Sequence, residues 1–179
     1  METGITVRPI EATDRDWVVR FLQQHWGSDR VAAHGELFYP ADHPGFVAVQ
    51  QGNAVGLVTY VLVADACEIT LIDSGIPFLG IGTTLIEAVT KAARQAGCAR
   101  VWLVTTNDNL DALRFYQRRG FALVDLHPNA IQAARALKPE IPLIGQYGIP
   151  LRDELYLEMS LTDETWLAPW FCADHTSPI

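Results

Sequence analysis

The sequence predicts a single domain of the mixed α+β (α/β) class, in which about six or seven strands form one mixed sheet flanked by helices. Three observations carry this prediction. A chain of 179 residues has the length of one domain, at roughly 100–200 residues per domain. Closely spaced strand patterns in the first half favour an antiparallel meander. A strand, glycine loop, helix and buried strand then follow in order, which predicts a parallel pair with a right-handed crossover.

The first elements are a strand, a helix and an irregular segment. Ile5–Ile10 alternates weakly and is expected to be an edge strand. Apolar residues recur at helical spacing over Asp14–His25, behind a cap at Thr13 or Asp14. Val31–Pro44 contains glycine, two prolines and two histidines, and we expect a flexible segment there with at most one helical turn.

The remaining elements are bounded by turn residues. The strands of the meander are predicted at Gly45–Gln50, Val55–Val63 and Cys67–Asp73. After the loop Ser74–Gly82 we predict a helix at Thr83–Ala96, a buried strand at Arg100–Thr106, a helix at Leu110–Arg118 capped by Asn109, a strand at Phe121–Leu126, a short helix at Asn129–Leu137 and a last strand at Glu154–Leu161.

Composition excludes several classes of protein. The 13 basic and 21 acidic residues leave a net charge of −8, whereas duplex-binding domains show a basic excess, so no nucleic-acid partner is expected. No signal peptide or membrane span is expected either, which favours a cytoplasmic setting. Three scattered cysteines and five scattered histidines show no metal-ligand spacing, so no metal is expected.

The glycine loop at Gly80–Leu85 fits neither common nucleotide motif. A dinucleotide fingerprint requires glycine where Leu85 stands, and a P-loop requires lysine where Ile81 stands. What remains is a glycine turn that leads into a helix N-terminus, where free N–H groups and the helix dipole favour an anion such as pyrophosphate. A tight turn without a ligand is the alternative.

A second motif follows the buried strand and favours a ligand-binding role for the loop over a plain turn. Asn109, Ala112, Tyr116, Gly120 and Phe121 form the pattern N-x-x-A-x-x-x-Y-x-x-x-G-F. With the preceding glycine loop, this order resembles the GNAT superfamily of N-acetyltransferases over most of the chain, from about residue 5 to residue 161. Pro77 departs from the family loop, which usually has Gln or Arg at that position.

The resemblance implies a splayed sheet and acetyl-CoA as co-substrate, with no metal. It implies that Tyr116 is the general acid for the leaving thiolate. Ile72 and Ser74 would bond the pantetheine arm through their backbone groups, and a backbone N–H at about Ile72 would stabilise the oxyanion. The further residues implied to bind acetyl-CoA are Gly80, Ile81, Gly82, Thr83 and Asn109.

The general base is sought on the strand Cys67–Asp73. Strict alternation would place Glu68 on one face and Asp73 on the other, so that only one of them faces a shared cleft. We favour Glu68, because several members of the family use a carboxylate on this strand. The alternative is a water chain as the proton acceptor.

The expected activity is transfer of an acetyl group from acetyl-CoA to a primary amine by direct attack. The acceptor could be a small metabolite, an antibiotic-like polyamine or a protein amine. The alternatives are a non-catalytic module that binds or senses acyl-CoA, and an acyltransferase with another acyl donor or a hydroxyl acceptor. Residues 1–162 are expected to form the acetyltransferase domain of a monomer or homodimer, followed by a tail at 163–179 that packs on the domain, pairs two subunits or lines the acceptor site.

Overall fold

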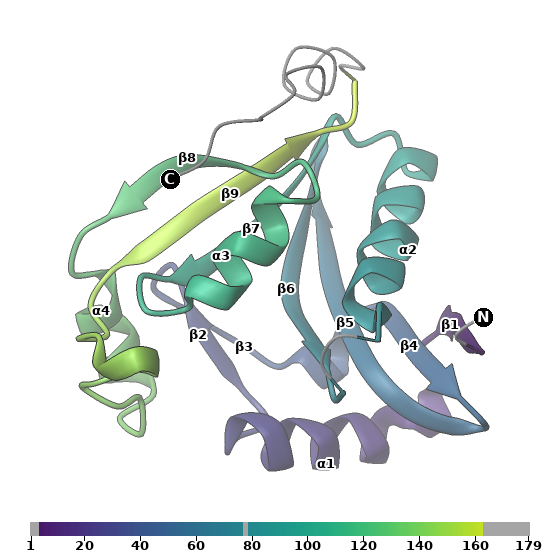
Figure 1. Ribbon diagram of the computed structural model, residues 1–179, viewed down its shortest axis with the longest axis horizontal. Helices are drawn as coiled ribbons and strands as arrows, with labels where there is room; N and C mark the ends of the chain where they lie inside the picture. Colours follow the sequence, from purple (N-terminus) through teal and green to yellow (C-terminus); the bar gives the residue numbers. More distant parts are fainter. Residues whose placement is uncertain (1–3, 77–78, 163–179) are drawn as a thin grey trace, which may run out of the picture.

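The computed structural model describes residues 4–76 and 79–162, which form a seven-stranded mixed sheet flanked by helices (Figure 1). The strand order is β1-β4-β5-β6-β7-β9-β8, and a separate two-stranded hairpin consists of β2 and β3. The predicted tail at 163–179 and Pro77 lie outside the described residues. None of the helices in the described ranges is long and apolar enough to cross a membrane.

The strands lie close to their predicted positions. In the large sheet they are β1 (Ile5–Pro9), β4 (Gly45–Gln50), β5 (Asn53–Val63), β6 (Ala66–Ser74), β7 (Arg100–Thr106), β8 (Ala122–His127) and β9 (Glu154–Ser160). Strands β4, β5 and β6 form the predicted antiparallel meander, and β1 is an edge strand. The last strand, β9, lies between β7 and β8 and pairs antiparallel with both.

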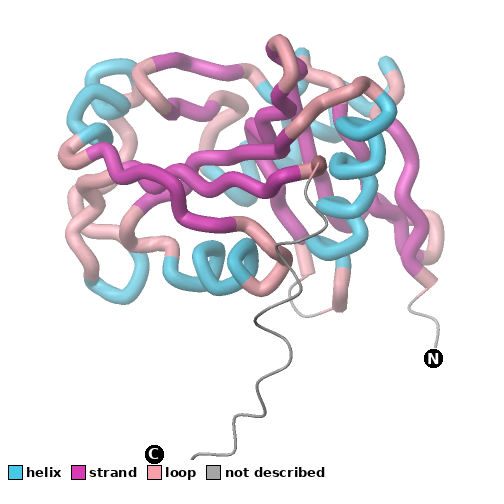
Figure 2. The backbone as a smooth tube through the Cα atoms, turned by 90° about the horizontal axis from the view of Figure 1, so that it is seen from above, coloured by secondary structure: helices cyan, strands magenta, loops and turns pink. Residues whose placement is uncertain are grey.

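Helices cover both faces of the sheet, as Figure 2 shows from above. They are α1 (Arg15–Trp26), α2 (Ile81–Gln95), α3 (Leu110–Gln117) and α4 (Ala130–Leu137), with 3₁₀ turns at Ala12–Asp14, Pro40–Asp42 and Gln146–Gly148. One apolar core lies between the sheet and α2 and α3, and a second lies between the other face and α1. Helix α4 packs on the β2–β3 hairpin.

The segment after α1 is more regular than we predicted. Val31–Ala33 (β2) and Glu36–Phe38 (β3) form an antiparallel hairpin, and a 3₁₀ turn follows at Pro40–Asp42. The expectation of a flexible segment was therefore wrong for the hairpin, although the single helical turn is present. Each strand has only three residues, too few for periodicity to indicate a strand.

The sheet opens in its middle. Strand β6 pairs in parallel with β7 only from Ala66–Arg100 to Ile69–Leu103, after which the two strands separate. In Figure 1 they diverge in a V, with α3 in front of the opening. The edge of β6 that faces β7 therefore has no neighbouring strand over residues 70–74. Backbone groups at such an edge are available to a ligand.

A bulge in β6 changes which side chains share a face. Thr59 of β5 pairs with Leu71, and the next residue, Tyr60, pairs with Ile69, so Thr70 is extra. Before the bulge, Cys67 and Ile69 belong to the core under α2 and α3. After it, Leu71 belongs to the core under α1. The alternation shifts by one residue, as a β-bulge requires.

This shift corrects the prediction that Glu68 and Asp73 lie on opposite faces. Glu68 contacts the β2–β3 hairpin, and Asp73 accepts a hydrogen bond from Trp26 Nε1 at the end of α1 (2.7 Å). Both carboxylates therefore lie on the α1 face of the sheet. The bulge depends on the pairing of β5 with β6, which strict alternation within one strand does not encode.

Candidate active site

A cavity of about 760 Å³ lies where β6, the start of α2 and α3 meet. Its lining includes seven of the predicted site residues: Ile72, Ser74, Gly80, Ile81, Gly82, Thr83 and Tyr116. The structure thus brings together residues from three separate elements, of which Ile72 and Ser74 had been predicted by their position on the strand and the others by the two motifs.

The two loop glycines serve different purposes. Gly80 precedes α2 with φ = 82°, a left-handed conformation that favours glycine. Gly82 lies in the first turn, where an added Cβ would lie 2.9 Å from Cζ of Phe115 on α3. Gly80 therefore permits the turn, whereas Gly82 permits α2 and α3 to approach each other beside the cavity.

The start of α2 lies beside the cavity, and its first N–H groups have no acceptor within the helix. No side chain caps the helix, and Thr84 N–H is bonded to the carbonyl of Gly80. The N–H groups that precede it have no partner four residues back in the helix. They lie at the positive end of the dipole of a 15-residue helix. This end of the cavity suits an anionic group.

Tyr116 is part of the core as well as of the cavity wall. It is 7% exposed and packs against Phe115 and Phe121, at ring-centroid distances of 5.2 and 5.6 Å. Burial raises the pKa of Tyr116 above its ordinary value of 10, so the phenol is protonated at neutral pH. The packing and the proton-donor interpretations are compatible.

Asn109 and Glu68 do not line this cavity. The Oδ1 atom of Asn109 accepts a hydrogen bond from Ala112 N–H (3.2 Å), so Asn109 is the predicted N-cap of α3. Its contact with acetyl-CoA stays a prediction. Glu68 lies on the opposite face of the sheet, where its Oε1 is 2.9 Å from Nε2 of His34.

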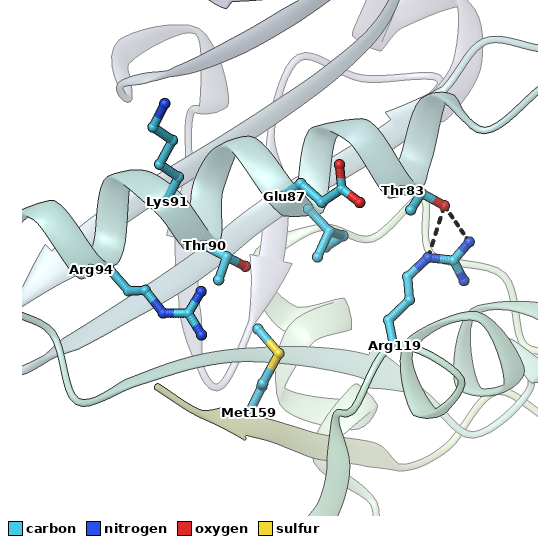
Figure 3. A pocket seen from close by; sticks show the side chains of 8 residues that line it. Thr83, Glu87, Thr90, Lys91, Arg94, Arg119 and Met159 are labelled. Carbon is cyan, nitrogen blue, oxygen red and sulfur yellow. Dashed lines mark hydrogen bonds between the residues drawn. The ribbon is translucent and has the colours of Figure 1, made fainter. Parts of the chain in front are cut away.

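A smaller cavity of about 340 Å³ adjoins the first and shares Thr83 and Arg119 with it. Figure 3 shows Arg119 reaching from the end of α3 to Thr83, with a hydrogen bond from Nε to Oγ1 of 3.0 Å. The Arg119 guanidinium also lies 3.7 Å above the centre of the Phe115 ring. Arg119 therefore forms the partition between the two cavities.

The smaller cavity contains a buried hydroxyl without a partner. Thr90 is 8% exposed, and its Oγ1 has no hydrogen-bond partner among the described residues. In Figure 3 this hydroxyl points into the space between α2 and Met159 of β9, where Arg94 also extends. An unpaired buried hydroxyl costs free energy.

Basic side chains gather around both cavities although the chain is acidic overall. Five of the 13 lysines and arginines line them, against two acidic residues, Glu87 and Asp111. The five are Lys91, Arg94, Arg114, Arg118 and Arg119. None of these five residues was among the predicted site residues. The available signal is that Arg114 lies in the last turn of α3 and that Arg118 and Arg119 follow directly after the helix.

No potential metal site is found within the described ranges, because no group of three or more His, Cys, Asp or Glu side chains converges there. His34 and His43 instead contact strand β6 individually, at Glu68 and Thr70. His25 lies 3.3 Å from Asp73.

Comparison with known proteins defines the class. The model of the acetyltransferase (GNAT) family matches residues 13–121. An uncharacterised protein of Bacillus subtilis (strain 168), YxbD, is 41% identical over 158 residues, which cover 88% of this chain and 99% of that protein. The chain therefore belongs to the GNAT acetyltransferase family.

Two further comparisons extend this result. The streptothricin acetyltransferase of Streptomyces lavendulae is 33% identical over 129 residues, which cover 69% of this chain and 66% of that protein. Among solved structures, a GNAT family acetyltransferase from Elizabethkingia anophelis with acetyl-CoA bound has a TM-score of 0.64 at 19% identity, covering 88% and 99% of the two chains. That likeness concerns the fold.

Proposed function

We propose that this protein transfers an acetyl group from acetyl-CoA to a cationic primary amine. The observation that carries the proposal is the 760 Å³ cavity, which joins the open edge of β6, the free N-terminus of α2 and the phenol of Tyr116. An open strand edge suits the amide groups of pantetheine, a helix N-terminus suits pyrophosphate, and a protonated phenol suits a leaving thiolate.

Acetyl-CoA follows the two cavities in this proposal. Its pyrophosphate binds the N–H groups at Ile81, Gly82 and Thr83, and its pantetheine arm runs along Ile72 and Ser74. The 3′-phosphate end enters the smaller cavity, where Arg94 receives it (Figure 3). The basic lining of both cavities supports a ligand with several phosphate charges.

The reaction requires a neutral amine. A lysine-like amine has a pKa of about 10.4, so at pH 7 about one molecule in 2,500 is neutral. A base on the enzyme supplies the neutral form, and the amine then attacks the thioester carbonyl. A backbone N–H at about Ile72 stabilises the oxyanion. Tyr116 donates its proton to the CoA thiolate as the C–S bond breaks.

Direct attack is favoured over an acyl-cysteine intermediate. The two cysteines within the described residues, Cys67 and Cys98, are buried. Burial raises the pKa of the Cys67 thiol to about 12, so it stays protonated at neutral pH and is a poor nucleophile. Neither thiol lines the cavity that holds Tyr116.

The carboxylates on the α1 face of the sheet, opposite the larger cavity, support a cationic acceptor. Glu68, Asp73 and Glu154 lie there, and Glu154 is 1% exposed. Carboxylates favour a positively charged substrate. Streptothricin is the first amine to test, because a relative at 33% identity is a streptothricin acetyltransferase. Spermidine and a lysine-containing peptide represent the other acceptor classes.

The test combines binding with turnover. We expect acetyl-CoA to bind one site per chain in calorimetry, and acetylated amine to form. Tyr116→Phe removes the proposed general acid and should lower kcat about 100-fold or more. The Kd for acetyl-CoA should stay within about twofold of the wild-type value. Tyr60→Phe is the matched control: Tyr60 stacks on Phe46 of β4, outside the cavity, and its loss should leave kcat unchanged.

Other outcomes would favour the alternatives. Binding of acetyl-CoA without turnover of any amine would indicate a CoA-binding module. Faster transfer from a longer acyl-CoA, or to a hydroxyl, would indicate a different acyltransferase. Equal turnover in Tyr116→Phe would remove the acid from the mechanism.

A further inference from the structure

The tip of the β2–β3 hairpin holds a histidine in an unusual backbone conformation. Ala33 pairs with Glu36, so His34 and Gly35 form the two-residue turn between them. Both have positive φ, 39° for His34 and 78° for Gly35, as a type I′ turn requires. Such φ values are uncommon for residues other than glycine, and histidine is among those that tolerate them. An outlier of this kind points to a function for the side chain.

A buried carboxylate holds this turn against the sheet. The backbone N–H of His34 lies 3.0 and 3.1 Å from the two carboxylate oxygens of Glu154 at the start of β9. Glu154 is 1% exposed. The hairpin tip is therefore fixed to the sheet through the backbone of the same residue whose imidazole points at β6.

The imidazole covers the carboxylate that sequence reasoning selected as the base. His34 Nε2 lies 2.9 Å from Oε1 of Glu68. The Glu68 side chain is 9% exposed and that of His34 is 19% exposed. The ring also packs against Phe38 and Trp102, at centroid distances of 5.0 and 5.8 Å. A substrate on this face therefore reaches the imidazole more easily than Glu68.

This pair lies where the sheet opens. Glu68 pairs with Trp102 of β7, one position before the last parallel pair, Ile69–Leu103. Tyr116 and Ile72 line the cavity that reaches the same opening from the other face. A thioester placed in the opening would have the phenol on one side and the imidazole on the other.

The charges around the ring are all negative within the described residues. Glu68 faces it from β6, Glu36 from β3 and Glu154 from β9. The hydrogen bond to Glu68 and these charges raise the pKa of His34 above 6.5, against the opposing effect of burial. A base with a pKa near the working pH is the most effective one.

We propose that His34, oriented by Glu68, takes the proton that the acceptor ammonium loses. This inference rests on the proposed function and identifies its base. With neutral His34 donating from Nε2–H to Glu68, the lone pair on Nδ1 accepts a proton from R–NH₃⁺. The resulting imidazolium is stabilised by the Glu68 carboxylate.

The remaining bonds and protons balance. The neutral amine forms the C–N bond and the C–S bond breaks. Tyr116 gives its proton to the departing thiolate, and the phenolate recovers a proton from the nitrogen of the new amide. His34 then releases its proton to solvent. The sum is R–NH₃⁺ plus acetyl-CoA giving the acetamide, CoA–SH and H⁺.

Three variants test the proposal, each assayed with streptothricin and with spermidine. His34→Gln keeps a donor toward Glu68 but has no titrating base. His34→Gly suits the positive φ and leaves a space the size of imidazole. His127→Gln is the control, because His127 is also paired with a carboxylate, Asp125 at 3.0 Å, but on the exposed strand β8.

We expect kcat to fall about 100-fold or more in His34→Gln and His34→Gly, with the Kd for acetyl-CoA unchanged. The rise of kcat/KM with pH through the His34 titration should disappear in both. Added imidazole should restore His34→Gly at least tenfold and leave His34→Gln and the control unaffected. A merely structural histidine would show no such rescue.

A spectroscopic measurement needs no acceptor. In NMR titrations, His34 should titrate above 6.5, and Glu68→Gln should lower that value. Titration of His34 at or below 6.5 in the wild type, or full activity of His34→Gln with an unchanged pH profile, would overturn the proposal. Absence of turnover in the wild-type protein would instead overturn the proposed function, so the two failures are distinct.

Discussion

Replacing Gly82 by valine should weaken acetyl-CoA binding through a clash with Phe115. A Cβ at this position lies 2.9 Å from Cζ and 3.0 Å from Cε2 of that ring. Carbon atoms prefer a separation of about 3.5–4.0 Å, so the ring or the start of α2 must move by roughly 0.6–1.1 Å. The movement carries Thr83 and Arg119 with it, because they are hydrogen-bonded beside the ring.

The expected magnitude follows from the cost of overpacking. Such substitutions cost about 1–3 kcal/mol. If the bound state requires the original approach of α2 and α3, this cost appears in the binding free energy. It then raises the Kd for acetyl-CoA by about 5- to 150-fold. Loss of one hydrogen bond from the helix N-terminus to a charged phosphate falls in the same range.

Calorimetric titration with acetyl-CoA measures this effect, and a double-mutant cycle assigns its cause. In a Phe115→Ala background the added side chain has room, so Gly82→Val should cost less than about threefold there. Gly97→Ala is the control: it introduces a residue at φ = 80° at the other end of α2, with no atom within 4 Å. It should lower Tm and leave the Kd unchanged.

Two results would refute this reasoning. An unchanged Kd in Gly82→Val would show that the start of α2 does not form the acetyl-CoA site. An equal loss of affinity in the wild-type and Phe115→Ala backgrounds would show that the ring is not what the valine meets.

Three more predictions concern stability and specificity. Glu68 raises the pKa of His34, so the ion pair contributes its full stability below pH 6.5. This contribution is lost as the pH rises through the raised pKa. The Tm difference between wild type and His34→Gln should therefore be larger at pH 6 than at pH 9. Arg94→Ala should weaken binding of CoA several-fold but not of 3′-dephospho-CoA, measured by calorimetry at one salt concentration; equal losses for both ligands would contradict a 3′-phosphate site. Asn109→Ala should cost about 1 kcal/mol of stability through the lost helix cap and also raise the Kd for acetyl-CoA; a lower Tm with unchanged Kd would limit Asn109 to capping.

Much of the fold was predictable because its signals are local. Helix α2 begins after Gly80 and the chain turns at Gly97, and both glycines have the positive φ that such positions favour. The apolar run at Arg100–Thr106 is an interior strand of the sheet, with Val101, Leu103 and Thr105 buried on one face and a half-buried opposite face. These signals depend on neighbours within a few residues.

The missed elements depend on weaker or more distant signals. The β2–β3 hairpin has three-residue strands, and its turn contains histidine rather than the asparagine or aspartate that usually precedes glycine in this turn. The available indication was the dipeptide His34-Gly35 between two short, mainly apolar runs. The β6 bulge leaves no mark on the sequence of that strand alone, yet it decides that Glu68 and Asp73 face α1.

From the sequence by itself, the domain class, the order of all elements except the β2–β3 hairpin, the family resemblance and seven of the residues around the larger cavity were determined. The tertiary structure decided the partners: His34 on Glu68 across 34 positions, Arg119 on Thr83 across 36, and the hairpin tip on Glu154 across 120. The physical reason is that motifs and helix caps depend on residues that are close together in the sequence. The His34–Glu68 pair and the smaller cavity are instead formed by side chains that only strand pairing and helix packing bring together.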